Sequence, residues 1–536
     1  MRKIDLADAS FLYLERREVP MHVGGLFLFT PPENEDREAF LANLYDTLCS
    51  SEELRPPFGE YVTTGRAGPV GGLYWEKDRN IDLDYHVRHS ALPQPGRFRE
   101  LFALVSRLHS TLLDRNRPLW EVYLIEGLES GQVALYMKLH HATIDGVGAL
   151  KLVEAMCSTS PKTRTPHSPL SLAIYEQVRK KETQGKHSRK VVPTKSELKV
   201  VTDFLKQQYG MSMNLLGIVK DYAKSWLGAG GGLAVPFRNI PRTTLSSNVS
   251  GSRRFVAQSW SIDRFHAIGE AMGGTVNDVV LAVCAGALRR YLISYEKLPK
   301  RSLKAMVPVA LKIDDAEGSA NAISFITADL ATEIRDPEKR FRQIRESMLA
   351  GKEMLKGLSA REATLLWQII QASGLLVSLA GVANRIPAFS ATISNVPGYQ
   401  KPLYWNGARL DGIYPASIPF DGMAMNITLV SYNNMLDFGI IACRRSVPGV
   451  QRMVDYMEEA LVELEDMIGS KARPPARKLV KKTVRKTVKK KTPTKKAVQK
   501  KALTKKVLKK KTLTKKVLKK KTLKKKALKK RVKKTT

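Results

Sequence analysis

The sequence predicts an α/β protein with two halves and a separate basic extension at its C-terminus. Strand-like apolar runs alternate with segments of helical apolar spacing, first near the N-terminus and again after about residue 250. The 536 residues exceed what one hydrophobic core usually covers. We therefore expect four regions, namely an N-terminal half over 1–185, a connecting segment over 186–250, a C-terminal half over 251–470 and a tail over 471–536.

Five elements are predicted in the first half. Residues 26–29 form an apolar run after two glycines, which indicates a strand. In 97–116 the apolar residues recur at helical spacing. Residues 119–125 and 132–139 are β-rich runs joined by a short connection that contains glycine, which predicts a strand pair. A second helix is expected over 147–156.

The second half repeats this mixture of helices and strands. A long helix is expected first, then two strands, three late strands and a final helix. In chain order these elements cover 277–291, 305–309, 323–330, 390–394, 424–431, 436–443 and 450–468. Two α/β halves joined by a long connection are the simplest architecture for this order.

The net charge of +38 is concentrated at one end of the chain. Residues 471–536 hold 33 of the 89 Lys and Arg residues and no Asp or Glu, which leaves 56 basic and 51 acidic residues elsewhere. The body is therefore nearly neutral, which argues against a basic nucleic-acid-binding fold. The tail has a ten-residue repeat from 501, and its self-repulsion predicts disorder in isolation.

Composition also predicts the compartment. The four cysteines are more than a hundred residues apart, so neither a zinc site nor a disulfide framework is expected. The N-terminus carries early acidic residues and lacks the apolar core of a secretory signal. The most apolar stretch, 365–383, is interrupted by Gln, Ser and Gly and is too polar for a convincing membrane span. We expect a cytoplasmic protein whose membrane contact is peripheral.

The most informative motif is HHATIDG at residues 140–146, between a predicted strand and a predicted helix. If the strand pleat continues, His141 joins the buried face and His140 points to the other face. A buried neutral histidine that reaches the end of a channel suits a general base for an alcohol. Asp145 can order the turn or pair with an arginine, and Gly146 permits tight backbone geometry before the helix.

Two other interpretations of this motif stay open. The histidines could be packing residues and Asp145 a helix cap, as lone residues of these types usually are. His140 and Asp145 also fit an H-x-x-x-x-D spacing that resembles that of membrane glycerolipid acyltransferases, which would make His140 the base. The second histidine, its predicted burial and the trailing glycine favour His141. Adjacent histidines on a strand cannot easily ligate one ion, so no metal site is expected.

With its surroundings, the motif resembles the bacterial wax ester synthase/acyl-CoA:diacylglycerol acyltransferase family. It matches HHxxxDG, which that family shares with the CoA-dependent acyltransferase superfamily. The other matching segments are DASFLYLE at 8–15, PMHVGG at 20–25, PLW at 118–120, TVND at 275–278, SNVPG at 394–398 and IPFDG at 418–422. The resemblance covers about residues 3–468. Tyr399 stands where the family usually has Pro, and the lysine-rich tail lies outside the family pattern.

This resemblance implies two chloramphenicol-acetyltransferase-like halves with the active site between them. It implies transfer of a long-chain acyl group from a fatty acyl-CoA to a fatty alcohol or diacylglycerol, which yields storage wax esters or triacylglycerols. His141 would take the hydroxyl proton and return one to the CoA thiolate. No covalent acyl-enzyme and no cofactor are then needed, since acyl-CoA is a substrate. The sequence has no G-x-S-x-G that would supply a serine nucleophile.

Five residues outside the motif are candidates for substrate binding or oxyanion stabilisation. Asn277, beside Asp278 at a predicted helix start, either donates to the oxyanion or caps the helix. Asn395 and Gly398 resemble a tight turn, for which a structural role is the simpler explanation. Trp120 would line a channel or belong to the core.

The tail admits three interpretations: attraction to anionic phospholipid, non-specific binding of nucleic acid, or a solvated extension without function. We favour the inner membrane or a lipid droplet, because that location suits lipid chemistry and the tail lacks aromatic residues for base stacking. A different kind of function is a catalytically weak acyltransferase-fold binding protein, tethered to anionic lipid or nucleic acid by its tail. A further alternative is an acyltransferase for a non-lipid acceptor.

Overall fold

A computed structural model describes residues 1–50, 53–65, 68–144, 146–176, 233–315, 318–356 and 380–472, together with residue 224 and isolated residues between 362 and 378. Residues 1–473 belong to one compact unit. Asp145, most of the predicted connecting segment and the lysine-rich tail lie outside the described residues.

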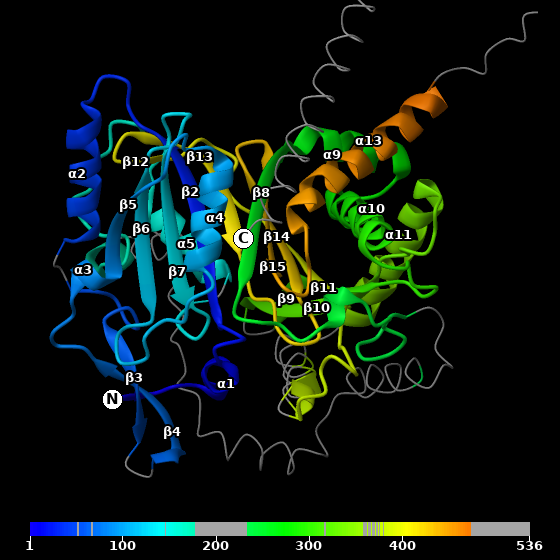
Figure 1. The fold of residues 1–536 in the computed structure, drawn as a ribbon, viewed down its shortest axis with the longest axis horizontal. Coiled ribbons are helices and arrows are strands. Elements are labelled where there is room, and N and C mark those ends of the chain that lie inside the picture. Colours follow the sequence, from blue (N-terminus) through cyan, green and yellow to red (C-terminus); the bar gives the residue numbers. More distant parts are fainter. Residues whose placement is uncertain are drawn as a thin grey trace, which may run out of the picture. The chain divides into compact units, whose positions relative to one another are not determined.

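The first half is built on a six-stranded mixed sheet (Figure 1). Its neighbouring strands run antiparallel, except that β5 and β6 are parallel. In sheet order the strands are β12 (Tyr404–Trp405), β13 (Ala408–Ala416), β2 (His22–Thr30), β7 (Val133–His140), β6 (Trp120–Glu126) and β5 (Val87–Ala91). Helices α2 (Arg37–Leu48) and α5 (Gly146–Met156) share a core with one face, and α4 (Phe98–Leu108) shares another core with the opposite face.

The second half contains the other six-stranded sheet and the largest core. Its strands, in sheet order, are β10 (Gly318–Asp329), β9 (Lys304–Asp315), β11 (Ala391–Val396), β14 (Met425–Tyr432), β15 (Met435–Cys443) and β8 (Arg253–Ser261). The helices are α9 (Ile262–Met272), α10 (Val276–Tyr295), α11 (Pro337–Leu355) and α13 (Met453–Ala472). Helix α10 lies in the middle of this group and packs against the other three.

Smaller elements complete the fold. A three-stranded sheet has the order β1 (Arg2–Lys3), β4 (Gly68–Lys77) and β3 (Glu60–Gly65). The remaining helices are α1 (Leu6–Leu14), α3 (Leu83–His86) and the short 3₁₀ turns η1 (Thr244–Ser246) and η2 (Val450–Arg452). Helix α1 follows the first edge strand and precedes β2, so it leads directly toward the strand that pairs with β7.

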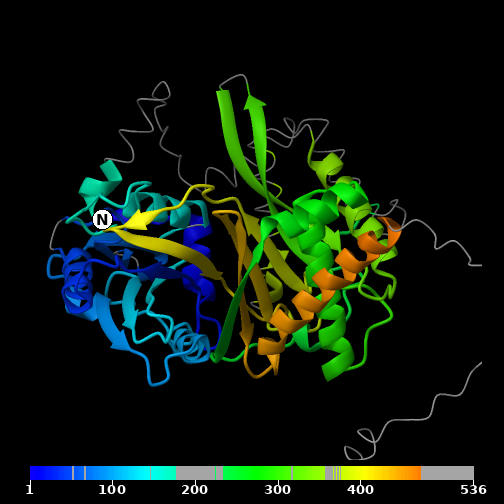
Figure 2. The same cartoon turned by 90° about the horizontal axis from the view of Figure 1, so that it is seen from above.

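Two strands from the C-terminal part of the chain complete the sheet of the first half. Strands β12 and β13 come late in the chain, yet they extend the first sheet, where β13 pairs antiparallel with β2 (Figure 2). Between Leu410 and Gly412 this ladder shifts register at an irregularity. The boundary at residue 250 therefore separates the halves along the sequence but not within the first sheet.

Strand β7, which leads into the HHATIDG motif, is buried along its whole length. Its odd-numbered residues from Val133 to Leu139 belong to the core shared with α2 and α5, as the predicted alternation requires. Ala134 and Tyr136 belong to the core shared with α4. Both faces of the strand are therefore covered, and burial does not distinguish one face from the other.

The predicted strand pair is confirmed, because β6 and β7 are antiparallel neighbours. The helix predicted over 97–116 is shorter in the structure and ends at Leu108, with His109 as its C-cap. No single helix in the described part of the chain is long and apolar enough to cross a bilayer. Helices α9 and α10 pass that test only as a pair, and they meet at an angle of 100°.

Candidate active site

The HHATIDG segment forms a tight turn between β7 and α5. His140 is the last residue of β7 and pairs with His22 of β2. The backbone N–H of His141 donates to the carbonyl of Met21 at 2.9 Å. Thr143 closes the turn, since both its N–H and its hydroxyl donate to the carbonyl of His140, at 2.9 and 2.7 Å.

Two other predicted site residues, Asp145 and Gly146, follow the turn along the chain. Gly146 is the first residue of α5, so the helix begins one residue earlier than the sequence predicted and Gly146 lies within it. Asp145 lies outside the described residues, so its predicted orienting role stays a prediction.

His140 is fully buried, with 0% of its surface exposed. Its Nδ1 accepts the backbone N–H of Ala142 at 3.1 Å, so this nitrogen carries no proton. Its Nε2 lies 3.4 Å from Glu15 Oε1 but makes no well-aligned hydrogen bond. A ring held in this way orders the turn and does not face solvent.

His141 is half-buried and lies against an aromatic platform. Its ring stacks on the ring of Phe11 from α1, with centroids 4.0 Å apart and an interplanar angle of 18°. The sequence predicted that His141 is buried and that His140 points to the other face. In the structure His140 is the fully buried residue and His141 is half-buried, so this prediction is wrong. Because β7 is covered on both faces, its last residue, His140, is enclosed, and the chain turns outward only at His141.

Glu15 follows α1 and is the main charged residue beside the histidine pair. Its carboxylate is only 2% exposed and accepts hydrogen bonds from Arg115 at 3.1 and 3.2 Å and from the Met21 N–H at 3.1 Å. Burial raises the pKa of Glu15, but the nearby His140 ring, the Met21 N–H and the charge of Arg115 together outweigh it and lower the pKa. The carboxylate is thus held ionised in a buried position.

Two further buried histidines, His22 and His109, lie next to this site, since His22 pairs with His140 and contacts His109. His22 Nε2 lies 2.9 Å from the carbonyl of His109, and His109 contacts the Tyr136 hydroxyl at 2.7 Å and the Ser417 carbonyl at 3.2 Å. Burial lowers the pKa of His22 far below its usual value and lowers that of His109 to about 3. Both rings are therefore neutral, and they tie the end of α4 to β2 and to the 417–422 segment.

Sequence reasoning did not assign roles to Phe11, Glu15, His22 or His109. Phe11, Glu15 and His22 lie in the matched segments 8–15 and 20–25, which was the available signal. Their partners lie more than a hundred residues away along the chain in most cases, so no local spacing shows the contacts.

Trp120 belongs to the core rather than to a channel wall. It is 1% exposed, its indole N–H donates to the Phe58 carbonyl at 2.8 Å, and its ring stacks on His86 with centroids 4.4 Å apart. Both its apolar surface and its only donor are therefore already used.

The start of α10 differs from the prediction in one respect. Thr275 is the N-cap, and its side chain forms a reciprocal capping box with Asp278, whose Oδ2 accepts from the Thr275 N–H at 2.8 Å. Asn277 is the second residue of the helix, so the interpretation of it as the cap is wrong. Its half-buried side chain makes no hydrogen bond to any described residue, whereas Asp278 Oδ1 is buried without a partner.

The SNVPG segment also differs from the tight turn that was predicted. Asn395 is part of β11 and pairs with Leu429 of β14. Gly398 lies in the following loop, where a Cβ atom would come 2.3 Å from the Ser431 carbonyl oxygen. The next residue, Tyr399, donates its hydroxyl to Glu154 and to the Leu150 carbonyl of α5, both at 3.3 Å. This loop therefore packs on the helix that follows the histidine motif.

The predicted site residues do not all meet in the structure. Trp120 packs against Phe58 and His86, and Asn395 pairs within the second sheet, whereas the ring of His141 stacks on Phe11. Phe11, however, also packs against the core of the second half. The platform under His141 therefore lies where the two halves meet.

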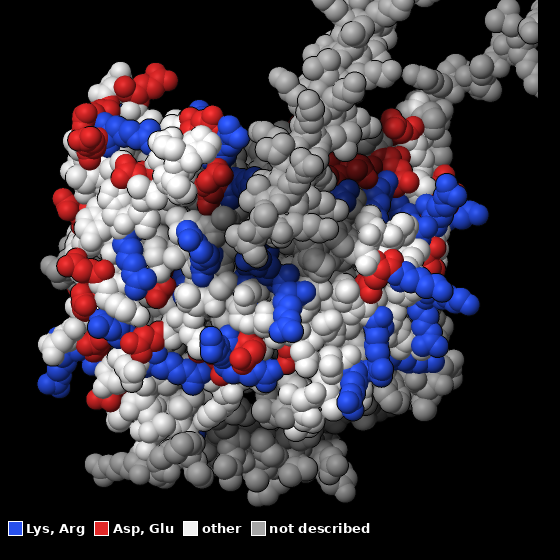
Figure 3. Space-filling view, viewed as in Figure 1, with Lys and Arg blue, Asp and Glu red and all other residues white. Residues whose placement is uncertain are grey.

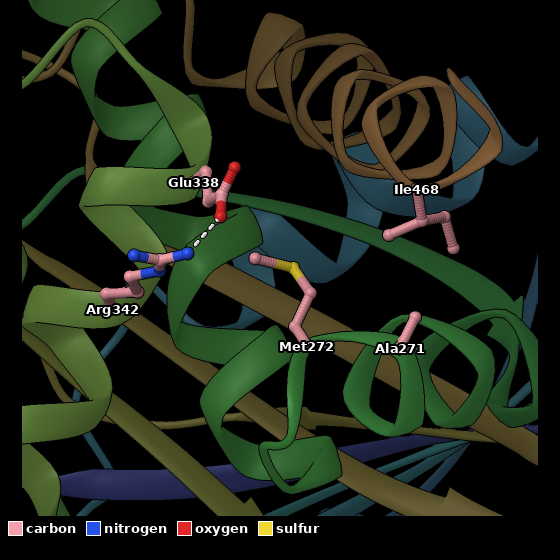
Figure 4. A pocket seen from close by; sticks show the side chains of 5 residues that line it. All are labelled: Ala271, Met272, Glu338, Arg342 and Ile468. Atoms are coloured by element: carbon pink, nitrogen blue, oxygen red, sulfur yellow. Dashed lines mark hydrogen bonds and ion pairs between the residues drawn. The ribbon is translucent and has the colours of Figure 1, made fainter. Parts of the chain in front are cut away.

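Two pockets lie elsewhere. One of about 180 Å³ is formed by the ends of α9, α11 and α13, where the ion-paired Glu338 and Arg342 face apolar side chains (Figure 4). Another of about 580 Å³ lies beside α2 and is also lined by residues near Arg164 and Asn406. Neither is lined by a predicted site residue. Among the described residues, no group of three or more His, Cys, Asp or Glu side chains could hold a metal ion.

Comparison with known proteins decides which family shares these features. The family model of the wax ester synthase/diacylglycerol acyltransferase catalytic domain matches residues 5–280, and the model of the WS/DGAT C-terminal domain matches residues 319–465. The chain belongs to the wax ester synthase/diacylglycerol acyltransferase family. The resemblance predicted from the motifs is thereby confirmed.

Relatives match this family member over most of its length. A probable diacylglycerol O-acyltransferase of Mycobacterium tuberculosis is 41% identical over 464 residues, which cover 86% of this chain and 98% of the relative. The O-acyltransferase WSD of Acinetobacter baylyi is 39% identical over 470 residues, which cover 87% and 98%. These relatives give no support to the binding-protein alternative.

Solved structures confirm the predicted fold class. The wax ester synthase/diacylglycerol acyltransferase of Marinobacter aquaeolei VT8 is 38% identical, with a TM-score of 0.69 over 88% of this chain and 100% of that one. The first condensation domain of the CDA synthetase is 16% identical with a TM-score of 0.51, which shows a shared fold alone. This family member therefore has the mixed α/β, two-half architecture expected from its sequence.

Proposed function

We propose that this protein is an O-acyltransferase that moves a long-chain acyl group from acyl-CoA to a fatty alcohol, a diacylglycerol or both. The observation that carries the proposal is the match to the acyltransferase family along nearly the whole body, with HHATIDG intact at the matching position. The relatives named above are diacylglycerol and wax ester acyltransferases, which supports both classes of acceptor.

In the proposed reaction, His141 is the general base. It removes the hydroxyl proton as the acceptor oxygen attacks the thioester carbonyl carbon, which gives a tetrahedral intermediate. The carbon–sulfur bond then breaks, and the imidazolium returns the proton to the departing CoA thiolate. The products are an ester and free CoA, and no covalent acyl-enzyme forms.

Two observations favour His141 over His140 for this role. The Nδ1 atom of His140 already accepts a backbone hydrogen bond, and its ring is fully enclosed. The half-buried ring of His141 is the one that an acceptor alcohol could approach. The H-x-x-x-x-D alternative, in which His140 is the base, would require the turn to open.

Asn277 remains a proposed donor to the oxyanion of the tetrahedral intermediate. Its amide is half-buried, is not used as a helix cap and has no partner among the described residues. A preorganised donor of this kind would stabilise negative charge that develops on the carbonyl oxygen. Asp145 is proposed to orient the turn, and no role in binding substrate is proposed for Trp120.

We further propose that the enzyme acts at an anionic lipid surface, such as the inner membrane or a lipid droplet. The sequence of the tail supplies positive charge for this contact. The body adds Arg99 of α4, Arg254 of β8 and Arg444, whose side chains form no ion pair with a described residue. Basic side chains gather near α4 and β8 on the face seen in Figure 3. Burial lowers the pKa of Arg254, and repulsion from Arg444 and Arg99 lowers it further.

The test is an acceptor panel. Full-length protein and the His141→Ala variant are assayed for thiol release from palmitoyl-CoA with hexadecanol, a diacylglycerol or a non-lipid alcohol. We expect release that depends on a lipid acceptor and is lost in the variant. Release with the non-lipid alcohol alone would favour another acyltransferase activity. No release by folded wild-type protein with any acceptor would contradict the proposed function.

A further inference from the structure

We propose that helix α1 positions both histidines of the motif, with Phe11 as the positioning residue for His141 and Glu15 as the positioning residue for His140. The proposal rests on the proposed function for its catalytic consequence, but its structural part can be tested without activity. The family resemblance assigns no role to either residue.

Phe11 lies in α1, and Glu15, one helical turn further along the chain, is the residue that caps its C-terminus. The Glu15 N–H donates to the Phe11 carbonyl at 3.0 Å, which fixes their spacing. Residues four positions apart project from the same face of a helix. One face of α1 therefore meets two consecutive residues of a chain segment more than a hundred positions away.

Phe11 acts on the ring of His141 through its π-face. The stacked geometry, with centroids 4.0 Å apart, restricts the plane of the imidazole. An aromatic face attracts a cation above it, so the same contact stabilises the imidazolium that forms when His141 takes a proton. Phe11 therefore both orients the base and favours its charged form.

Glu15 acts on the turn through its buried carboxylate. Its Oε1 atom approaches His140 Nε2 and accepts the N–H of Met21, while Arg115 holds Oε2. The carbonyl of Met21 in turn accepts the backbone N–H of His141. A single buried carboxylate is thus connected to both histidines, to the ring of one and to the backbone of the other.

The second half of the protein reaches the same helix. Phe11 and Leu14 pack against its core, and Arg16, just after α1, pairs with Asp421 of the IPFDG segment. The position of the histidine pair consequently depends on packing between the two halves, and not only on the strand and turn that carry it.

The first test measures the protonation of His141 by NMR of ¹³C-labelled histidine rings, with its signal assigned from its absence in His141→Ala. Phe11→Leu removes the π-face and should lower the titration midpoint of His141 by about half a pH unit. Phe11→Trp should keep the midpoint at or above the wild-type value. Tyr13→Leu, an exposed change on the same helix, should leave it unchanged.

All other ionisable groups around the ring stay the same in these variants, so a shift reports the loss of the aromatic face. The ionisable side chains on the elements that pack around the His141 ring are Asp8, Glu15, His22, Arg115 and His140. Asp145, four residues after His141, lies outside the described residues. Identical midpoints for His141 in wild type, Phe11→Leu and Phe11→Trp would overturn the role of Phe11.

The second test separates positioning by Glu15 from general stability. Glu15→Gln keeps an acceptor for Met21 but removes the charge, and it should lower kcat roughly tenfold with the KM for acyl-CoA within about twofold. Arg115→Lys loosens the same carboxylate without removing it and should lower kcat less. Unchanged kcat in both folded variants would overturn the role of Glu15.

Wild-type protein without acceptor-dependent release would contradict the proposed function alone, since the NMR comparison would still decide the role of Phe11.

Discussion

The two halves of the protein differ in the histidines that they bury, although the second half also buries ionisable groups such as Lys304, Arg340 and Asp437. All four histidines that the described residues bury, namely His22, His86, His109 and His140, lie in the first half together with Lys138 and Glu121. The central helix α10 of the second half is almost wholly apolar along its buried face, with Asp278 used to cap its start. Buried ionisable groups are costly unless they are paired, so the concentration of buried histidines in the half that carries the motif indicates a role there.

The largest effect on stability is expected from breaking the buried ion pair between Lys138 of β7, the strand that leads into the motif, and Glu121 of β6. Lys138 is 0% exposed, and its ammonium lies 3.2 Å from Glu121 Oε2 and 3.1 Å from Thr111 Oγ1. Burial lowers the pKa of Lys138, and Glu121 opposes this change. Lys138→Met should cost about 3–5 kcal/mol of unfolding free energy, because Glu121 is left buried with weaker compensation.

Chemical denaturation of Lys138→Met and of the double variant Lys138→Met/Glu121→Met checks this expectation. The double variant should recover much of the loss, because no buried charge is left alone. If the single variant were as stable as wild type, the pair would contribute nothing and the contrast between the halves would lose its energetic basis.

A buried carboxyl group of the second half should make stability depend on pH. Asp437 of β15 accepts from Ser259 at 2.6 Å and from the Ile413 N–H at 2.8 Å, yet burial raises its pKa to about 6. A raised carboxyl pKa means that the folded state holds its proton longer than the unfolded state. Stability from this group is therefore present below about pH 4 and is lost as the pH rises through 6.

Asp437→Asn removes this titration. Relative to the variant, wild-type protein should lose about 3 kcal/mol of unfolding free energy between pH 3.5 and 7. Urea unfolding of both proteins across that range measures the difference. A difference that stays constant with pH would show that Asp437 does not titrate as described.

The loop that contacts α5 should tolerate no side chain at Gly398. Its added Cβ would lie 2.3 Å from a backbone oxygen, so Gly398→Ala must displace the loop or β14 and should cost about 1–3 kcal/mol. Gly469→Ala on α13 is the matched control, because nothing lies within 4 Å of its added Cβ. Thermal melting compares them, and equal melting temperatures would contradict the close approach.

The smallest effect is expected at the surface. Removing the charges of Arg254 and Arg444 should weaken binding to phosphatidylcholine–phosphatidylglycerol vesicles several-fold, at up to about 1 kcal/mol per charge. Arg2→Gln with Arg37→Gln removes the same net charge away from this patch and should have less effect. Vesicle co-sedimentation measures both. Equal weakening by the two pairs would show that only total charge matters.

Sequence reasoning predicted the parts of this fold that depend on local patterns. The alternation in β7 and the two β-rich runs around residue 128 are enough to predict a strand pair that ends at the histidine motif. The placement of β13 beside β2 was not predicted, because nothing within either strand encodes a partner almost four hundred residues away. The same reason hides the contact between Glu15 and His140.

The errors in the site have similar causes. His140 was expected to face away from the core because alternation assumes one covered face, whereas β7 has two. Asn277 was considered a helix cap although Thr275, two residues earlier, forms a better capping box with Asp278. Asn395 was placed in a turn on composition, but its pairing with Leu429 extends β11 as far as Val396.

The central claim is that His141 reacts while His140 supports the turn. The direct measurement is the acyl-transfer rate and the melting temperature of His141→Ala and His140→Ala, compared with wild type. We predict that His141→Ala lowers kcat by about 10²–10⁴-fold at an unchanged melting temperature, whereas His140→Ala lowers the melting temperature and retains more activity. An active His141→Ala beside an inactive, fully folded His140→Ala would contradict the account.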